Sequence, residues 1–133
     1  MFDVLVLEDD ELVLDVTVQA LEDAGYAVQM AENGDDALRY LKASQVCQLL
    51  ITDINLGTKM NGFDVVQHAR ALRPELKVIY YSGLPGNWQG RPLEENARRL
   101  NKPFRFADLL ESLNELKVWP SLPPMLGRDA EPF

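Results

Sequence analysis

Short apolar runs alternate with segments in which apolar residues recur every three or four positions along most of this 133-residue chain. The apolar runs cover residues 3–7, 26–30, 48–52 and 77–81. Because these runs lack a regular alternation of apolar and polar positions, they predict strands buried on both faces of a parallel sheet. The segments with helical spacing cover residues 11–24, 35–43, 62–72 and 106–116. Strands alternating with helices of this length predict right-handed crossovers and a doubly wound α/β domain.

Two helix ends have local explanations, and one stretch of the chain is irregular. Gly25 follows the first helical segment, where a left-handed cap is expected, and the residue before Pro74 leaves the helical region. Within 84–101, prolines and glycines come first and the polar sequence LEENARRLN follows. This stretch allows a helix over part of 92–97 and a fifth strand at 98–101, which would be unusually polar.

The C-terminal residues differ in composition from the rest of the chain. Four prolines within 118–133 exclude a helix or a central strand there. We therefore divide the chain into a domain at 1–117 and a proline-rich tail at 118–133. The tail is either a flexible extension, a linker to a further domain, or a segment whose Trp119, Leu122 and Met125 dock on a hydrophobic surface.

Composition and charge narrow the range of functions. The formal net charge of -8 makes binding to a nucleic-acid backbone unfavourable. No apolar run approaches the roughly 20 residues of a membrane span, and no basic region precedes the first apolar run, as a signal peptide requires. The single cysteine, Cys47, excludes an internal disulfide or a cysteine zinc site. These features predict a cytoplasmic protein that binds neither nucleic acid nor membrane.

Acidic side chains gather where two predicted strands end. Glu8 and Asp9 follow the first strand, and Asp53 follows the third. In a flavodoxin-like five-stranded sheet of order 2-1-3-4-5 these strands are neighbours, so the three carboxylates would converge at the ligand-binding edge. Carboxylates this close repel one another, and a hard divalent cation such as Mg²⁺ is the usual remedy. The backbone carbonyl of Asn55 is a further candidate ligand.

The acidic run at residues 8–11 also has a simpler interpretation. It is typical of a solvated helix start, where the helix dipole favours negative charge. Asp10 and Glu11 are best explained in this way, as cap and first-turn residues. For Glu8 and Asp9, the third acid at the end of the neighbouring strand favours metal binding instead.

Two further polar residues follow strand ends. Ser82 closes the fourth predicted strand, and Lys102 comes directly after the fifth. Three acids, a metal, a hydroxyl and an ammonium together would suit an aspartyl phosphate, with one carboxylate as the nucleophile toward a phosphoryl group. The metal and Lys102 would then neutralise the phosphoryl oxygens.

With these motifs in place, the sequence resembles the receiver domain of two-component response regulators over about residues 3–117. The matching motifs are LVLEDDE at the first strand, ITDINLG and MNGFDV around the third, VIYYSG at the fourth and NKPF after the fifth. The resemblance implies that a histidine kinase or a histidine phosphotransfer protein donates the phosphoryl group. It also implies a signalling domain that acts on an output protein through protein contacts. Such a domain is not an enzyme beyond its self-catalysed phosphorylation and dephosphorylation.

The resemblance also implies a role for each residue of the predicted site. Asp53 would be the phosphoacceptor and Ser82 the switch hydroxyl. Lys102 would bind the phosphate. The Mg²⁺ ligands would be Asp9 directly, Glu8 through water, Asp53, and Asn55 through its carbonyl. The lone histidine, His68, is better explained as a surface or half-buried helix residue than as a phosphodonor, and Cys47 as a packing residue.

The sequence departs from the family pattern at three places. Gly57 stands where receivers often have proline. Arg99 stands where the family usually has an aromatic, three residues before the lysine. The stretch 84–101 is short, with proline and glycine where a fourth helix is usual. The Gly57 departure does not affect the chemistry. Arg99 and the short stretch leave open whether the common hydroxyl–aromatic switch operates and whether the chain forms a homodimer through the usual face.

Two other functions remain as alternatives. A pseudo-receiver, which binds partners but is never phosphorylated, is motivated by the atypical stretch 84–101. A phosphatase with an aspartyl nucleophile would need a second acid two residues after Asp53, and Asn55 stands there. The chain either acts alone or belongs to a longer protein.

Overall fold

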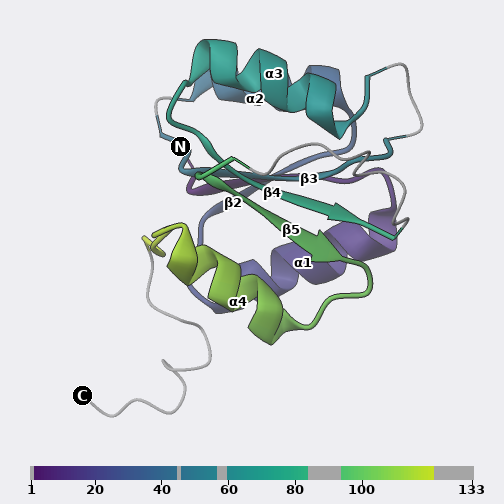
Figure 1. Cartoon of the computed structure of the whole chain (residues 1–133), viewed down its shortest axis with the longest axis vertical. Coiled ribbons are helices and arrows are strands. Elements are labelled where there is room, and N and C mark those ends of the chain that lie inside the picture. Colours follow the sequence, from purple (N-terminus) through teal and green to yellow (C-terminus); the bar gives the residue numbers. More distant parts are fainter. Residues whose placement is uncertain (1, 45, 57–59, 84–93, 122–133) are drawn as a thin grey trace.

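In the computed structural model of the chain, five parallel strands form one sheet between two layers of helices (Figure 1). The structure describes residues 2–44, 46–56, 60–83 and 94–121. The strands are β1 (Val4–Leu7), β2 (Val28–Ala31), β3 (Leu49–Asp53), β4 (Lys77–Ser82) and β5 (Ala97–Asn101). The helices are α1 (Glu11–Asp23), α2 (Gly34–Ala43), α3 (Gly62–Leu72) and α4 (Phe106–Glu115). The strand order is β2-β1-β3-β4-β5, so the predicted doubly wound sheet of order 2-1-3-4-5 is confirmed.

Apolar residues on the two faces of the sheet form two separate cores. Helices α2 and α3 cover one face and α1 and α4 cover the other (Figure 1). The three central strands are buried almost throughout, as the unbroken apolar runs predict. Neighbouring residues of one strand point to opposite faces, so that Tyr80 packs in the core beneath α2 and α3 and Tyr81 in the core beneath α1 and α4.

Local interactions fix where the helices start and stop. The side chain of Asp10 accepts hydrogen bonds from the backbone N–H groups of Leu12 and Val13 at 3.0 and 3.2 Å, which caps α1 as expected. Asn61 and Asp64 form a capping box at the start of α3. Gly25 follows α1 with a φ of 98°, the left-handed conformation predicted for the cap.

The stretch before β5 differs from one of our expectations. Residues 95–96 form a turn and Ala97 already belongs to β5, so the helix expected within 92–97 is wrong for residues 94–97. The backbone there pairs with β4, because the N–H of Val78 donates to the carbonyl of Asn96 at 3.1 Å. The fifth strand itself is confirmed, one residue longer than expected. Residues 84–93, where the fourth helix is usual, lie outside the described residues.

The described start of the C-terminal tail lies along the amino-terminal edge of the sheet. The carboxylate of Asp3 accepts hydrogen bonds from the Ser121 hydroxyl at 2.6 Å and from the Ser121 N–H at 3.2 Å. The Gln48 side chain bonds the backbone of Trp119 through both its amide atoms, and the Tyr26 hydroxyl donates to the carbonyl of Val118 at 2.9 Å.

These contacts test one of the three interpretations of the tail, the docking of Trp119 on a hydrophobic surface. The side chain of Trp119 is 55% exposed, so it does not dock on a hydrophobic surface, and the backbone around it makes the contacts instead. Leu122 and Met125 lie outside the described residues. The division into 1–117 and 118–133 stays a prediction. None of the helices in the described part of the chain has both the length and the apolar character needed to cross a lipid bilayer.

Candidate functional site at the carboxyl edge of the sheet

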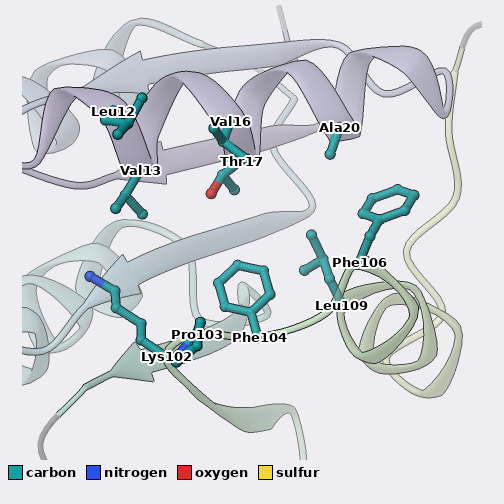
Figure 2. A pocket seen from close by; sticks show the side chains of 10 residues that line it. All are labelled: Leu12, Val13, Val16, Thr17, Ala20, Lys102, Pro103, Phe104, Phe106 and Leu109. Atoms are coloured by element: carbon teal, nitrogen blue, oxygen red, sulfur yellow. The ribbon is translucent and has the colours of Figure 1, made fainter.

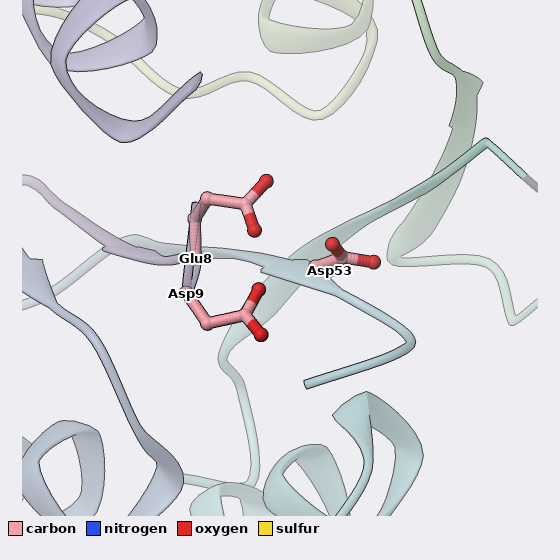
Figure 3. A group of neighbouring side chains, drawn as sticks. All are labelled: Glu8, Asp9 and Asp53. Atoms are coloured by element: carbon pink, nitrogen blue, oxygen red, sulfur yellow. The ribbon is translucent and has the colours of Figure 1, made fainter. Parts of the chain in front are cut away.

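The parallel register of β1 and β3 brings three carboxylates together at one edge of the sheet. Leu7 pairs with Thr52, so the residues that follow, Glu8 and Asp53, leave their strands side by side. Carboxylate oxygens of Glu8, Asp9 and Asp53 all lie within 4.8 Å of one another. Figure 3 shows Glu8 and Asp9 extending from the end of β1 on the side where Asp53 lies. The predicted convergence of the acids is therefore present in the structure.

The ammonium of Lys102 bridges two of these acids. Its Nζ donates to Oδ2 of Asp53 at 2.7 Å and to Oε1 of Glu8 at 2.5 Å. Glu8 is fully buried and Asp53 nearly so, and Lys102 is the cation that compensates them. The backbone that carries Lys102 is fixed to β4, because its N–H donates to the carbonyl of Ser82 at 2.9 Å. The Lys102–Pro103 peptide bond is cis.

Burial and ion pairing shift the pKa values of this pair. The pKa of Glu8 is raised from 4.5 to about 7, because burial outweighs the hydrogen bond from Lys102, which lowers it. Burial on its own lowers the pKa of Lys102, but hydrogen bonds to Asp53 and Glu8 outweigh it and the net shift is upward. Lys102 therefore stays charged. Glu8 resists ionisation even with the Lys102 ammonium beside it.

The other predicted site residues lie at the same edge. Ser82 is the buried last residue of β4, and its backbone carbonyl accepts from Lys102. Asn55 is exposed, and its N–H donates to Oδ1 of Asp53 at 3.1 Å. The structure brings Glu8, Asp9, Asp53 and Lys102 into direct proximity. Ser82 lies at the end of the adjacent strand β4, and Asn55 follows Asp53 by two residues.

A close backbone approach supports the position of Asp53. Gly62, the first residue of α3, donates its N–H to the carbonyl of Ile54 at 2.8 Å. A Cβ at Gly62 would lie 2.4 Å from the Asp53 carbonyl oxygen and 2.9 Å from the Ile54 Cα. Both contacts are with backbone that cannot move aside cheaply. A glycine is thus required here for α3 to pack against the chain that leaves the end of β3.

Tyr81 belongs to the site, although sequence reasoning assigned it only to the strand. The Lys102 ammonium lies 4.6 Å from the centroid of the Tyr81 ring, and the Phe104 ring meets the Tyr81 ring edge-on at 5.7 Å. The available signal was its position: Tyr81 comes directly before Ser82, at the carboxyl end of β4, and its side chain points to the face opposite that of Tyr80.

Arg99, His68 and Cys47 are not members of the acid cluster. Arg99 is an exposed residue of β5, so the position where receivers usually have an aromatic presents a cationic side chain. His68 is exposed on α3, as expected of a surface residue. Cys47 is half-buried before β3, and burial raises the pKa of its thiol to about 11, which is typical of a packing residue.

The chemistry of the acid cluster fits a hard divalent cation. Its side-chain donors are all carboxylate oxygens, which Mg²⁺ prefers, and no histidine or cysteine contributes. Asp9 is exposed and the other two acids are buried, so that a cation would have access from solvent on one side and fixed ligands on the other.

Comparisons with known proteins point to one family. The model of the response regulator receiver domain family matches residues 4–114. The response regulator receiver protein CpdR of Brucella abortus is 30% identical over 117 residues, which is 86% of this chain and 96% of CpdR. The sensor kinase CckA of the same organism is 28% identical over 85% of this chain, which spans only 12% of that kinase. A crystal structure of a receiver protein from Sinorhizobium medicae superposes with a TM-score of 0.75 at 28% identity, covering 86% of this chain and 92% of that chain.

Proposed function

This chain belongs to the response regulator receiver domain family of two-component signalling, and from that premise we propose that it accepts a phosphoryl group on Asp53. The observation that carries the proposal is the triangle of Glu8, Asp53 and Lys102. In this triangle the Asp53 carboxylate lies beside the Lys102 ammonium and beside Glu8, and with Asp9 nearby the three acids suit a metal. The partner that supplies the phosphoryl group is proposed to be a histidine kinase or a histidine phosphotransfer protein.

The proposed reaction is a displacement at phosphorus. A carboxylate oxygen of Asp53 forms the new bond to phosphorus while the bond from phosphorus to the donor's histidine nitrogen breaks. The imidazole leaves with that electron pair and takes up a proton. The developing charge lies on the phosphoryl oxygens, and Lys102 is within hydrogen-bond reach of the carboxylate that would carry them.

A Mg²⁺ ion is part of the proposal. Glu8, Asp9 and Asp53 would hold it through oxygen, together with the backbone carbonyl of Asn55. When bound, the ion neutralises charge on the carboxylates and on the phosphoryl oxygens. The residues of the chain do the remainder: Asp53 supplies the nucleophile, Lys102 the fixed positive charge, and Ser82 a hydroxyl at the end of the adjacent strand.

Removal of magnesium tests this function most simply. In the presence of Mg²⁺ and a small phosphodonor such as acetyl phosphate, intact-mass spectrometry should show the addition of one phosphoryl group. With chelator in place of Mg²⁺ the rate should fall by at least about 100-fold, because the carboxylates are then left to repel the incoming anion. A chain that takes up no phosphoryl group under either condition would be a pseudo-receiver instead.

An apolar surface beside the site suggests where the phosphodonor protein docks. A cavity of about 470 Å³ lies between α1 and the segment that runs from Lys102 into α4 (Figure 2). Leu12, Val16 and Phe106 line it and are 73%, 63% and 38% exposed. Lys102 lines the cavity and also donates hydrogen bonds to Glu8 and Asp53. A helical protein seated here would therefore hold its phosphohistidine next to Asp53.

Polar substitutions on α1 separate docking from chemistry. Leu12→Gln combined with Val16→Gln should slow transfer from a phosphotransfer protein that phosphorylates the wild-type chain by at least about tenfold, because two apolar contacts are lost. Phosphorylation by acetyl phosphate should be unchanged. The matched control is Leu72→Gln, at a leucine on α3 that is 43% exposed. It should affect neither rate. Equal slowing with both donors would contradict the docking site.

A further inference from the structure

Residues 117–121, which we call the exit strap, follow α4 and lie along the amino-terminal edge of the sheet. Side chains at the starts of two separate strands hold its first half. The ammonium of Lys77, the first residue of β4, donates to the carbonyl of Lys117 at 3.1 Å. The hydroxyl of Tyr26, which comes shortly before β2, donates to the carbonyl of Val118 at 2.9 Å.

The two strands between β2 and β4 in the sheet hold the second half of the exit strap. The Gln48 amide accepts from the Trp119 N–H at 3.3 Å and donates to the Trp119 carbonyl at 3.0 Å. The Asp3 carboxylate accepts from the Ser121 N–H at 3.2 Å and from the Ser121 hydroxyl at 2.6 Å. Asp3 and Gln48 come directly before β1 and β3. Four neighbouring strands therefore each contribute one side chain to the exit strap.

The end of α4 turns the chain toward this edge of the sheet. Lys117 has a φ of 60°, the left-handed conformation of a helix cap. Its N–H donates to the carbonyl of Asn114 at 3.1 Å, and the N–H of Val118 donates to the carbonyl of Leu113 at 2.9 Å, the pattern of a Schellman motif. Val118 is fully buried in the core beneath α1 and α4. The exit strap is thus anchored by an apolar side chain as well as by hydrogen bonds.

Opening of the exit strap would remove partners from two buried polar groups of the domain. Asp3 and Tyr26 are only 4% and 5% exposed. Asp3 would lose both bonds from Ser121 and retain the one from the Ala27 N–H at 3.0 Å, and the Tyr26 hydroxyl would lose its acceptor. A buried polar group that loses its partner is costly. Because the contacts fall on successive residues of one short segment, each of them also limits the freedom of its neighbours.

We propose that the exit strap belongs to the receiver fold, opens only as a unit, and fixes where the rest of the chain leaves the domain. The folded domain then ends at Ser121 and not at residue 117, where the composition of the tail placed its limit. Asp53 ends β3 at the carboxyl edge, so the chain after Ser121 starts from the opposite edge of the sheet. This inference concerns the resting protein and does not depend on phosphorylation.

Removal of one hydroxyl tests whether the exit strap opens as a unit. In the full chain, without Mg²⁺ or phosphodonor, hydrogen exchange followed by NMR should find the Ser121 amide protected. Tyr26→Phe deletes the bond to Val118 and not the bonds to Ser121, yet exchange at Ser121 should become about fivefold faster, because the unit has lost one hydrogen bond. Tyr40→Phe, which removes a hydroxyl from α2 on the other face of the sheet, should leave the rate unchanged. An unprotected Ser121 amide in the wild type, an unchanged rate in Tyr26→Phe, or equal acceleration in both variants would overturn the proposal.

A second variant tests the exit strap from its other end. Ser121→Ala removes the hydroxyl bond to Asp3 at an exposed residue, so that core packing is untouched. The amide of Trp119, which donates to Gln48 and not to Asp3, should then exchange about fivefold faster. A wild-type exchange rate at Trp119 in this variant would show that the contacts open independently and would overturn the proposal. If Tyr26→Phe fails to fold, Ser121→Ala decides the question alone.

Discussion

Replacing Asp53 by asparagine is expected to abolish phosphorylation of this chain by either acetyl phosphate or a phosphotransfer protein. An amide oxygen is not a competent nucleophile toward phosphorus. The fold should survive, because asparagine has the same shape and its oxygen can still accept the Asn55 N–H that now bonds Oδ1 of Asp53. Intact-mass spectrometry after incubation with Mg²⁺ and phosphodonor measures the outcome.

A neighbouring acid provides the matched control for Asp53→Asn. Asp10 caps α1 through its side chain and lies next to the acid cluster in sequence, and asparagine is an equally good cap. Asp10→Asn should therefore keep both stability and phosphorylation. If Asp53→Asn still gained a phosphoryl group, the acceptor would be another residue and the assignment of the site would be wrong.

Replacing Lys102 by methionine should affect both stability and chemistry. Loss of the ammonium leaves Glu8 and Asp53 without their cation in a buried setting. Breaking such a pair typically costs about 3 kcal/mol. Without Mg²⁺, the free energy of unfolding measured with urea should fall by about that amount. Saturating Mg²⁺ should recover part of the loss, because the ion can replace the ammonium as a counter-charge for the acids.

The same variant should be phosphorylated at least about 100-fold more slowly, because one fixed positive charge for the phosphoryl oxygens is missing. Lys42→Met, at an exposed lysine in the last turn of α2, is the control. It should change stability by less than about 1 kcal/mol and leave the rate unaltered. A stable Lys102→Met protein with the wild-type rate would show that the bridging geometry has no part in the chemistry.

The sequence was sufficient for the parts of the site that follow from strand register. Glu8 and Asp53 end adjacent parallel strands, so their proximity follows once the strand order is assumed, and that order is confirmed. The same argument places Ser82 and Lys102 at this edge. Each of these five strands and four helices begins and ends within two residues of its predicted limits. Buried parallel strands leave unbroken apolar runs, which makes them easy to locate.

Other parts could not be predicted, because they depend on three-dimensional contacts that leave no local pattern. Nothing in the dipeptide Tyr80-Tyr81 says which ring faces the acids; the pleat of β4 decides it. One of the three interpretations of the tail had Trp119 docking on a hydrophobic surface. Hydrogen bonds hold the start of the tail instead: Asp3 accepts from the Ser121 hydroxyl, and the Gln48 side chain bonds the Trp119 backbone. These contacts lie at the edge of the sheet opposite Asp53, because Asp3 and Gln48 come directly before β1 and β3. The described part of the tail thus does not cover the carboxyl edge of the sheet, where Asp53 lies.

Chemical mapping of the phosphoryl group tests the central claim most directly. An acyl phosphate is reduced by borohydride to an alcohol, so phosphorylated aspartate becomes homoserine, whereas phosphoserine and phosphohistidine do not. After phosphorylation with acetyl phosphate and Mg²⁺, reduction and peptide sequencing by mass spectrometry should find homoserine at position 53 and at no other acidic residue. This prediction excludes homoserine at Asp9 and 5-hydroxynorvaline, the corresponding product of glutamate, at Glu8. A phosphoryl group on another residue with Asp53 unchanged would contradict the account.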